Sequence, residues 1–396
     1  MNPSELEYTD AIFFSGHKFL GGPGSPGVLV IKSKWLRRNI VPVVPSGGTV
    51  VYVTNFDQDY SPHIEEREEG GTPETIGAIR LGLAFQVKHR IGSEAILALE
   101  HANVIRVHQR FHAHPNIVVL GGHGNPTPAS KLPIFSFLIR HRGRFLHFNY
   151  VGALLNDLFG VQSRGGCMCA APYSHRLMGV SDAINTEYAK ATRDMVYVVR
   201  PGYSRISFPY IMSDAQVEYI VSAVEFVASH GWKFLPQYEF KQATGAWTHK
   251  NLSLLSTTYM QDLGIDMACH GLGIRPSLKI VDTKNYHMYL TQAMALADEA
   301  SHMTSPIGRN PIPTSVEYLR WFSYPWESDQ GKTDLALTSR CPLAPIVYGD
   351  RRATPEKEML QVWSKSKLVW MRILNGGKEV MPFVKPIMRS RVEVVC

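Results

Sequence analysis

The feature that most constrains the fold of this chain is a loop rich in glycine and proline between two short apolar segments near the N-terminus. The apolar stretch 11–14 runs into a Ser-Gly-His-Lys turn at 15–18, and residues 21–27 contain four glycines and two prolines before a second apolar stretch at 27–31. Glycines let backbone approach an anion closely, and a deprotonated lysine amine forms Schiff bases. The pattern predicts two strands joined by a turn that suits an anion beside a reactive lysine, with a basic surface turn as the alternative.

Three regions differ in their pattern of apolar residues and predict the domain organisation. Residues 1–100 contain these strands and two long helices. Residues 101–235 alternate strands, at 117–120 and 134–139, with helices, which predicts a small α/β domain. Residues 236–396 form an extension of unknown role with weaker periodicity. The predicted helices lie at 75–90, 93–112, 148–159, 214–230, 287–302 and 356–370.

The composition excludes several classes of protein. With 44% hydrophobic and 19% charged residues, and no apolar run of about 18 residues, we expect a globular protein with no membrane partner. The polar, acidic N-terminus lacks the pattern of a signal peptide, which predicts a cytoplasmic protein. The net charge of +7 is spread along the chain, without a zinc-finger or RNA-binding signature, so we expect no nucleic-acid partner. Five cysteines without matched spacing predict neither a disulfide framework nor a metal site.

A second glycine-rich segment precedes the helix predicted at 75–90. The sequence Gly-Gly-Thr-Pro at 70–73 places N–H groups and the Thr72 hydroxyl at the positive end of that helix, which suits a phosphate group. Ordinary helix capping is the alternative. A further glycine pair lies in the segment 46–50, where a simple turn is the alternative.

Two other segments combine arginine with small or sulfur-containing residues. The segment 163–173 contains Arg164 followed by Cys167 and Cys169. A thiol beside an arginine is reactive when the positive charge lowers its pKa, whereas two buried, inert cysteines are the alternative. The other segment is Arg-Ile-Ser-Phe at 205–208, for which a surface arginine on a strand is the alternative.

Taken in order, these segments resemble those of class V aminotransferases and cysteine desulfurases, which depend on pyridoxal 5′-phosphate (PLP). The resemblance spans residues 11–210 and implies an α/β fold, that of the fold-type I PLP-dependent transferases. It implies that Lys18 is the catalytic Schiff-base lysine and that Ser15 and His17 contact the PLP phosphate. It also implies that Thr72 contacts the phosphate bound to the other subunit of a homodimer.

The resemblance further implies a small amino-acid substrate. Arg205, with Arg164 near it, would bind the substrate carboxylate, because a planar guanidinium binds a carboxylate through two hydrogen bonds. Cys169, not Cys167, lies where group II cysteine desulfurases have their catalytic, persulfide-forming cysteine. The histidines that usually precede that cysteine are replaced here by Cys-Met, so transamination, desulfuration and epimerisation all stay open.

The sequence departs from the family before Lys18. A long part of the large domain precedes the lysine in the family and supplies a helix N-terminus for the phosphate, a ring over the pyridine and an aspartate for the pyridinium nitrogen, whereas 17 residues precede Lys18 here. Asp10 lies too close to Lys18 to be that aspartate. We therefore expect an incomplete fold: a remnant of the large domain, the small domain and the extension. The expected function is a PLP-dependent transferase acting on an amino acid, and the alternative is a truncated, non-catalytic remnant that acts in binding or structure.

Overall fold

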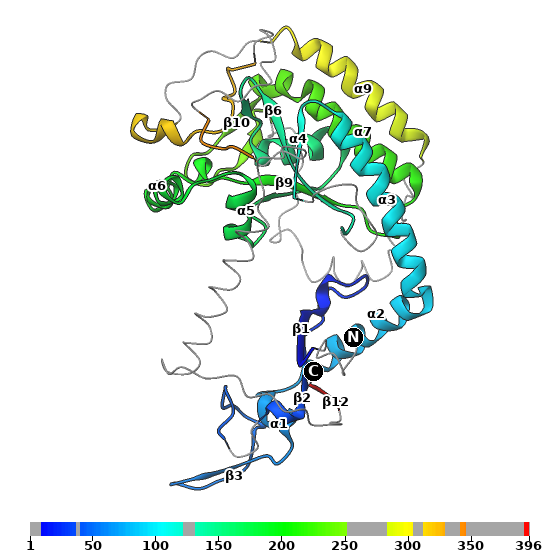
Figure 1. The fold of residues 1–396 in the computed structure, drawn as a ribbon, viewed down its shortest axis with the longest axis vertical. Coiled ribbons are helices and arrows are strands. Elements are labelled where there is room, and N and C mark those ends of the chain that lie inside the picture. The colour runs from blue at the N-terminus through cyan, green and yellow to red at the C-terminus, as the bar shows by residue number, and fades with distance from the viewer. Residues whose placement is uncertain are drawn as a thin grey trace, which may run out of the picture. The chain divides into compact units, whose positions relative to one another are not determined.

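The structure is a computed structural model in which residues 9–36, 40–121, 131–251, 283–303, 312–328, 341–345 and 392–395 are described. The chain divides into two compact units. Unit 1 comprises Met1–Ile96 together with Met359–Cys396, and unit 2 comprises Leu97–Glu358. The helix predicted at 356–370 lies outside the described residues. The fold mixes helices and sheets as predicted (Figure 1).

The predicted pair of strands forms the sheet of unit 1. Strand β1 (Ala11–Ser15) pairs antiparallel with β2 (Gly27–Lys32), and β12 (Val392–Val395) pairs with the other edge of β2. The 3-10 turn η2 (Gly16–Lys18) follows β1 directly, and a second, η3 (Ser33–Trp35), follows β2.

The rest of unit 1 consists of a hairpin and helices. The hairpin joins β3 (Val50–Val53) to β4 (Gln58–Tyr60), and the short helix α1 (Ile64–Glu68) follows it. Helix α2 (Thr75–Ile91) matches the predicted helix and ends at Gly92, whose φ of 89° separates it from the next helix, α3 (Ser93–Ala113). The rings of Phe14, Phe19 and Phe85 form an aromatic cluster with centroid separations of 5.1–5.9 Å.

Unit 2 is organised by one antiparallel sheet. Its strands lie in the order β5-β6-β9-β8, and β7 pairs with β6. The sheet forms because one face of the long strand β6 carries large apolar side chains, and Phe135 and Phe137 on this face are fully buried against Phe111 of α3. The strand bounds are β5 (Ile117–Leu120), β6 (Ile134–His141), β7 (Arg144–Phe145), β8 (Arg164–Gly166) and β9 (Tyr203–Ser207).

Local sequence signals explain where the helices of unit 2 begin and end. Helix α4 ends at Gly160, which takes the left-handed conformation. Helix α7 begins with a capping box between Ser213 and Gln216. At its end Gly231 has a right-handed φ of −55°, and the chain continues as a 3-10 helix; this glycine therefore does not act as a left-handed stop. The helices are α4 (Phe148–Phe159), α5 (Ala171–Leu177), α6 (Asp182–Arg193), η4 (Tyr197–Val199), α7 (Asp214–His230) and η5 (Gly231–Gln237).

Several of the described residues between 236 and 345 belong to the packed core of unit 2. Trp321 is fully buried, and its indole N–H donates to Val199 O at 3.0 Å. The hydroxyl of Tyr188 donates to Leu319 O at 2.9 Å. The elements of this region are β10 (Tyr238–Phe240), β11 (Trp247–His249), α9 (Lys284–Ala300) and η8 (Thr314–Leu319).

Helix α9 overlaps the helix predicted at 287–302: it begins three residues earlier than predicted and ends two residues earlier. Helices α3, α7 and α9 lie side by side in unit 2 (Figure 1). Within the described ranges, none of the helices is both long and apolar enough to cross a membrane.

Candidate functional site

Lys18 ends the turn η2, directly after strand β1. The turn is closed by the Phe19 N–H, which donates to Gly16 O at 3.0 Å. The glycine-rich loop folds back onto this turn so closely that a Cβ at Gly22 would lie 2.2 Å from Gly16 O. A glycine is therefore required there, and the loop leaves the side chains of His17 and Lys18 exposed.

The same loop packs against the beginning of helix α2. Arg80 donates a hydrogen bond to Pro23 O at 2.7 Å. A Cβ at Gly77 would lie 2.6 Å from Gly24 O. The two glycine-rich segments that the sequence suggests for phosphate binding thus belong to adjoining parts of unit 1.

Thr72 lies on an exposed turn before helix α2. The N-cap residue of this helix is Glu74, and its side chain makes no capping hydrogen bond. The Thr72 hydroxyl has no hydrogen bond to any residue in the described part of the chain, so this threonine does not cap the helix. The neighbouring Gly71 N–H donates to Gly47 O at 2.7 Å, which places the segment 46–50 directly beside Thr72.

The residues of unit 1 fit the phosphate and aldehyde ends of PLP in their chemical type. Lys18 offers an exposed amine and Thr72 an exposed hydroxyl. The Ser25 hydroxyl oxygen is buried beside Gly16 and has no hydrogen-bond partner in the described residues. Asp10 forms an ion pair with Lys32 at 3.0 Å within the strand pair, so its carboxylate already has a basic partner.

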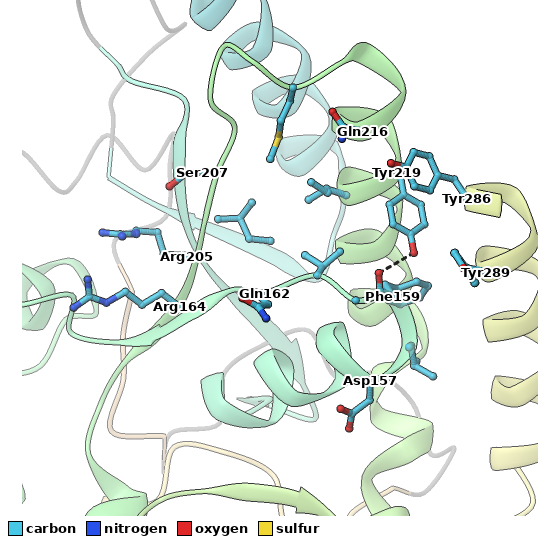
Figure 2. Close-up of a pocket in the computed structure, with 16 residues that line it drawn as sticks. Asp157, Phe159, Gln162, Arg164, Arg205, Ser207, Gln216, Tyr219, Tyr286 and Tyr289 are labelled. Carbon is cyan, nitrogen blue, oxygen red and sulfur yellow. Dashed lines mark hydrogen bonds between the residues drawn. The ribbon is translucent and has the colours of Figure 1, made fainter. Parts of the chain in front are cut away.

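In unit 2, Arg164 and Arg205 are directly opposite each other on neighbouring strands. They are register partners of the antiparallel strands β8 and β9, so their side chains lie on one face of the sheet. Figure 2 shows both guanidinium groups projecting in the same direction. Neither arginine forms an ion pair with an acidic side chain of the described residues. Like charges directly opposite each other destabilise a sheet, so the pair suits an anionic ligand such as a carboxylate.

The two cysteines of the third motif differ in their surroundings. Cys169 is exposed, and its sulfur accepts a hydrogen bond from Arg164 Nη2 at 3.1 Å. Met168 and Cys169 have positive φ values of 57° and 61°, a strained conformation that costs about 1–3 kcal/mol each and clusters at functional sites. Cys167 is half-buried, its thiol donates to Pro201 O at 3.2 Å, and burial raises its pKa. Cys169 is therefore the more accessible thiol, and it lies beside an arginine.

Close packing of glycines fixes this segment on the sheet. A Cβ at Gly165 would lie 2.4 Å from the Phe148 ring, and one at Gly202 would lie 2.5 Å from the same ring. Ser174 donates to Cys167 O at 2.8 Å and lies 3.0 Å from the Tyr203 hydroxyl. Gly165 and Gly202 thus let helix α4 pack directly against strands β8 and β9.

The predicted site residues fall into two groups, each described within its own unit. The structure brings Arg164 next to both Arg205 and Cys169. The other group, in unit 1, consists of Ser15, His17, Lys18 and Thr72.

A pocket of about 840 Å³ adjoins the arginine pair in unit 2. Its walls come from α4, β8, β9, α7 and α9, and its far side contains three tyrosines, Tyr219, Tyr286 and Tyr289 (Figure 2). The two tyrosines of α9 are not among the residues that the sequence motifs predict for the site. Their spacing of three residues, which places two aromatic rings on one helix face, is the signal that could have identified them.

Comparison with known proteins agrees with the motifs. The family model for aminotransferase class-V matches residues 2–220. A probable cysteine desulfurase of Streptomyces coelicolor is 27% identical over 219 residues, which cover 55% of this chain and 44% of that relative. The cysteine desulfurase of Cronobacter sakazakii is 32% identical over 165 residues, covering 41% and 37%.

Among solved structures, the apo cysteine desulfurase of Thermococcus onnurineus NA1 is 26% identical, with a TM-score of 0.44, and the match covers 56% of this chain and 47% of that one. The chain thus spans less than half the length of these relatives. Because the family model covers more than half of the chain, the chain belongs to the class V aminotransferase family, whose members depend on PLP.

Proposed function

We propose that this chain is a PLP-dependent transferase that acts on an amino acid, with Lys18 as the Schiff-base lysine. The observation that carries the proposal is the pair Arg164 and Arg205, which are opposite each other on β8 and β9 without an acidic partner in the described residues. Such a pair suits the carboxylate that every amino-acid substrate carries.

The residues of unit 1 hold the cofactor in this proposal. PLP, when bound, acts as an electron sink for the substrate's α-carbon. Lys18 would hold the cofactor by its aldehyde end through Nζ, and the same amine would then move the substrate's α-proton. Ser15 and His17 would donate hydrogen bonds to the cofactor's phosphate, and Thr72 would donate one to the phosphate bound to the other subunit of a homodimer. The exposed positions of His17, Lys18 and Thr72 support these roles.

Desulfuration is the reaction for which a further residue is available. In that reaction the Cys169 thiolate would attack the substrate's sulfur and form a persulfide, while the substrate's Cβ–S bond breaks and its electron pair passes to the carbon, which takes up a proton. The exposure of Cys169 and its 3.1 Å contact with Arg164 support this role. We expect cysteine-dependent sulfide release, in the presence of a thiol reductant, to be lost in Cys169→Ala and kept in Cys167→Ala. Loss in both variants, or in neither, would remove desulfuration and leave transamination or epimerisation.

The proposal includes a homodimer in the cytoplasm. Large apolar side chains on unit 1 are exposed in the structure, with Phe13 at 83%, Val43 at 87% and Phe56 at 97%. Exposed apolar patches of this kind mark interaction surfaces. Light scattering coupled to size-exclusion chromatography is expected to give twice the chain mass, and a monomer at micromolar concentration would contradict this part of the proposal.

An absorption spectrum with added PLP tests the cofactor assignment. We expect a Schiff-base band that borohydride fixes in the wild type and in Lys88→Ala, but not in Lys18→Ala. Lys88 is a matched control because it is a lysine of the same unit outside the predicted site. Equal bands in Lys18→Ala and the wild type would contradict the assignment.

The alternative is a non-catalytic protein that keeps this fold and acts through partners. The exposed apolar side chains of unit 1 favour it, because they suit a binding surface without any cofactor. It predicts no specific Schiff-base absorption band with PLP. It also predicts that Lys18→Ala leaves the binding of partner proteins unchanged.

A further inference from the structure

The loop that carries Cys169 is a tight turn with a strained backbone. The Ala170 N–H donates to Cys167 O at 3.0 Å, and this hydrogen bond closes a turn of four residues. Its two central residues, Met168 and Cys169, both have positive φ values, of 57° and 61°. Positive φ at both central positions is typical of a type I′ turn, in which glycine, asparagine and aspartate predominate. Methionine and cysteine keep this conformation only where contacts around the turn maintain it.

A buried side chain outside the turn supplies such a contact. Ser174 of helix α5 is fully buried, and its hydroxyl donates to Cys167 O, the carbonyl that closes the turn, at 2.8 Å. The Ser174 oxygen also lies 3.0 Å from the hydroxyl of Tyr203, which is buried as well. Because the single hydrogen of Ser174 is donated to the carbonyl, the Tyr203 hydroxyl is the donor in this second bond. A chain of hydrogen bonds thus runs from Tyr203 through Ser174 to the turn.

This chain of hydrogen bonds begins on β9, the strand that carries one arginine of the pair. The segment before the strand holds the turn a second time, because the Cys167 thiol donates to Pro201 O at 3.2 Å. The first residue of the turn is thus fixed through both its carbonyl and its side chain. Cys169 stays exposed, and its sulfur accepts from Arg164 Nη2 at 3.1 Å. The hydrogen bonds to Cys167 therefore determine where the Cys169 thiol lies relative to the arginines.

We infer that Ser174 is a positioning residue, which holds the strained turn 167–170 in the conformation that presents the Cys169 thiol to Arg164. The inference deepens the proposed function, on which it rests for the role of Cys169 in desulfuration. Ser174 acts on the thiol through the backbone, by its hydrogen bond to Cys167 O. Without that bond the turn loses a contact that maintains its positive φ values, and it should relax to a conformation in which the thiol no longer lies beside the guanidinium.

Two alkylating agents of different charge report where the thiol lies. Iodoacetate is an anion and iodoacetamide is neutral, so the ratio of their rates with Cys169 is higher when a guanidinium lies beside the thiol. The rates are measured on the full chain without PLP, by tandem mass spectrometry that separates Cys169 from Cys167. We expect the ratio to fall about three- to fivefold in Ser174→Ala, because the attraction between Arg164 and the anion is then lost.

Two further variants separate positioning from a general loss of stability. Ser181→Ala is the matched control, because the Ser181 hydroxyl caps helix α6 of the same unit by accepting from Ile184 N at 3.4 Å. It is expected to leave the ratio unchanged. Met168→Gly, added to Ser174→Ala, is expected to restore the ratio, because glycine adopts a positive φ without strain and the turn then needs no support from the serine.

The outcomes separate this inference from the proposed function. An unchanged ratio in Ser174→Ala, or an equal fall in Ser181→Ala, would overturn the inference. A fall that Met168→Gly does not reverse would also overturn it, since the serine would then not act through the turn. The expected ratios, in a chain that shows no PLP band and releases no sulfide, would support the positioning role of Ser174 and count only against the proposed function.

Discussion

The two units support their predicted site residues in different ways. In unit 2, Arg164 and Arg205 extend from a sheet whose other face is buried against α3, with Phe135 and Phe137 fully inaccessible. In unit 1, Lys18 lies on a turn that is held by close backbone contacts between glycines, while a neighbouring side chain such as Phe13 is 83% exposed. A site supported by a packed core and a site supported by backbone contacts should respond to different substitutions.

The largest expected effect on the free energy of unfolding comes from a substitution that creates a cavity in the core of unit 2. Trp321→Ala removes a fully buried side chain and its hydrogen bond to Val199 O, and it should lower the free energy of unfolding by about 3–5 kcal/mol. The matched substitution in unit 1, Phe13→Ala, should change it by less than about 0.5 kcal/mol because the ring is exposed. Urea unfolding followed by tryptophan fluorescence measures both. Comparable losses would show that the units do not differ in this way.

Acid should weaken unit 2 through two buried histidines. Burial lowers the pKa values of His141 and His147 to about 3, against about 6.5 in an unfolded chain. Between these values the unfolded state binds protons that the folded state does not, so stability is fully present above pH 6.5 and is lost as the pH falls toward 3, by up to a few kcal/mol. In His141→Asn the slope of unfolding free energy against pH should be shallower over that range by about one proton, or about 1.4 kcal/mol per pH unit, because other histidines with lowered pKa values, such as His112, still contribute. An unchanged slope would contradict the assignment.

A smaller effect should appear at the glycines of unit 1. Gly22→Ala would place a Cβ 2.2 Å from Gly16 O, so the turn that carries Lys18 should open, at a cost of about 1–3 kcal/mol. Gly82 lies inside helix α2 with open space around it, and Gly82→Ala should stabilise that helix by about 0.5–1 kcal/mol. Hydrogen exchange followed by mass spectrometry reports each segment separately. Equal exchange in residues 15–27 of both variants would refute the role given to the glycine contacts.

The same contrast explains what could be predicted from the sequence. The two strands around the glycine loop and the helices predicted at 148–159 and 214–230 depend on residues that are close together in the sequence, and the structure confirms them. The opposition of Arg164 and Arg205, and the stacking of Tyr286 on Tyr219, join segments far apart in the chain. They depend on strand order and helix packing, which local periodicity does not encode.

The most direct test of the account is to locate the lysine that PLP modifies. The full chain is incubated with PLP, reduced with borohydride and digested, and mass spectrometry then identifies the peptide that carries the phosphopyridoxyl group. We expect near-complete modification of the peptide that contains Lys18, and no modification at that position in Lys18→Ala. Modification spread over several exposed lysines, to the same extent in the wild type and in Lys18→Ala, would contradict it.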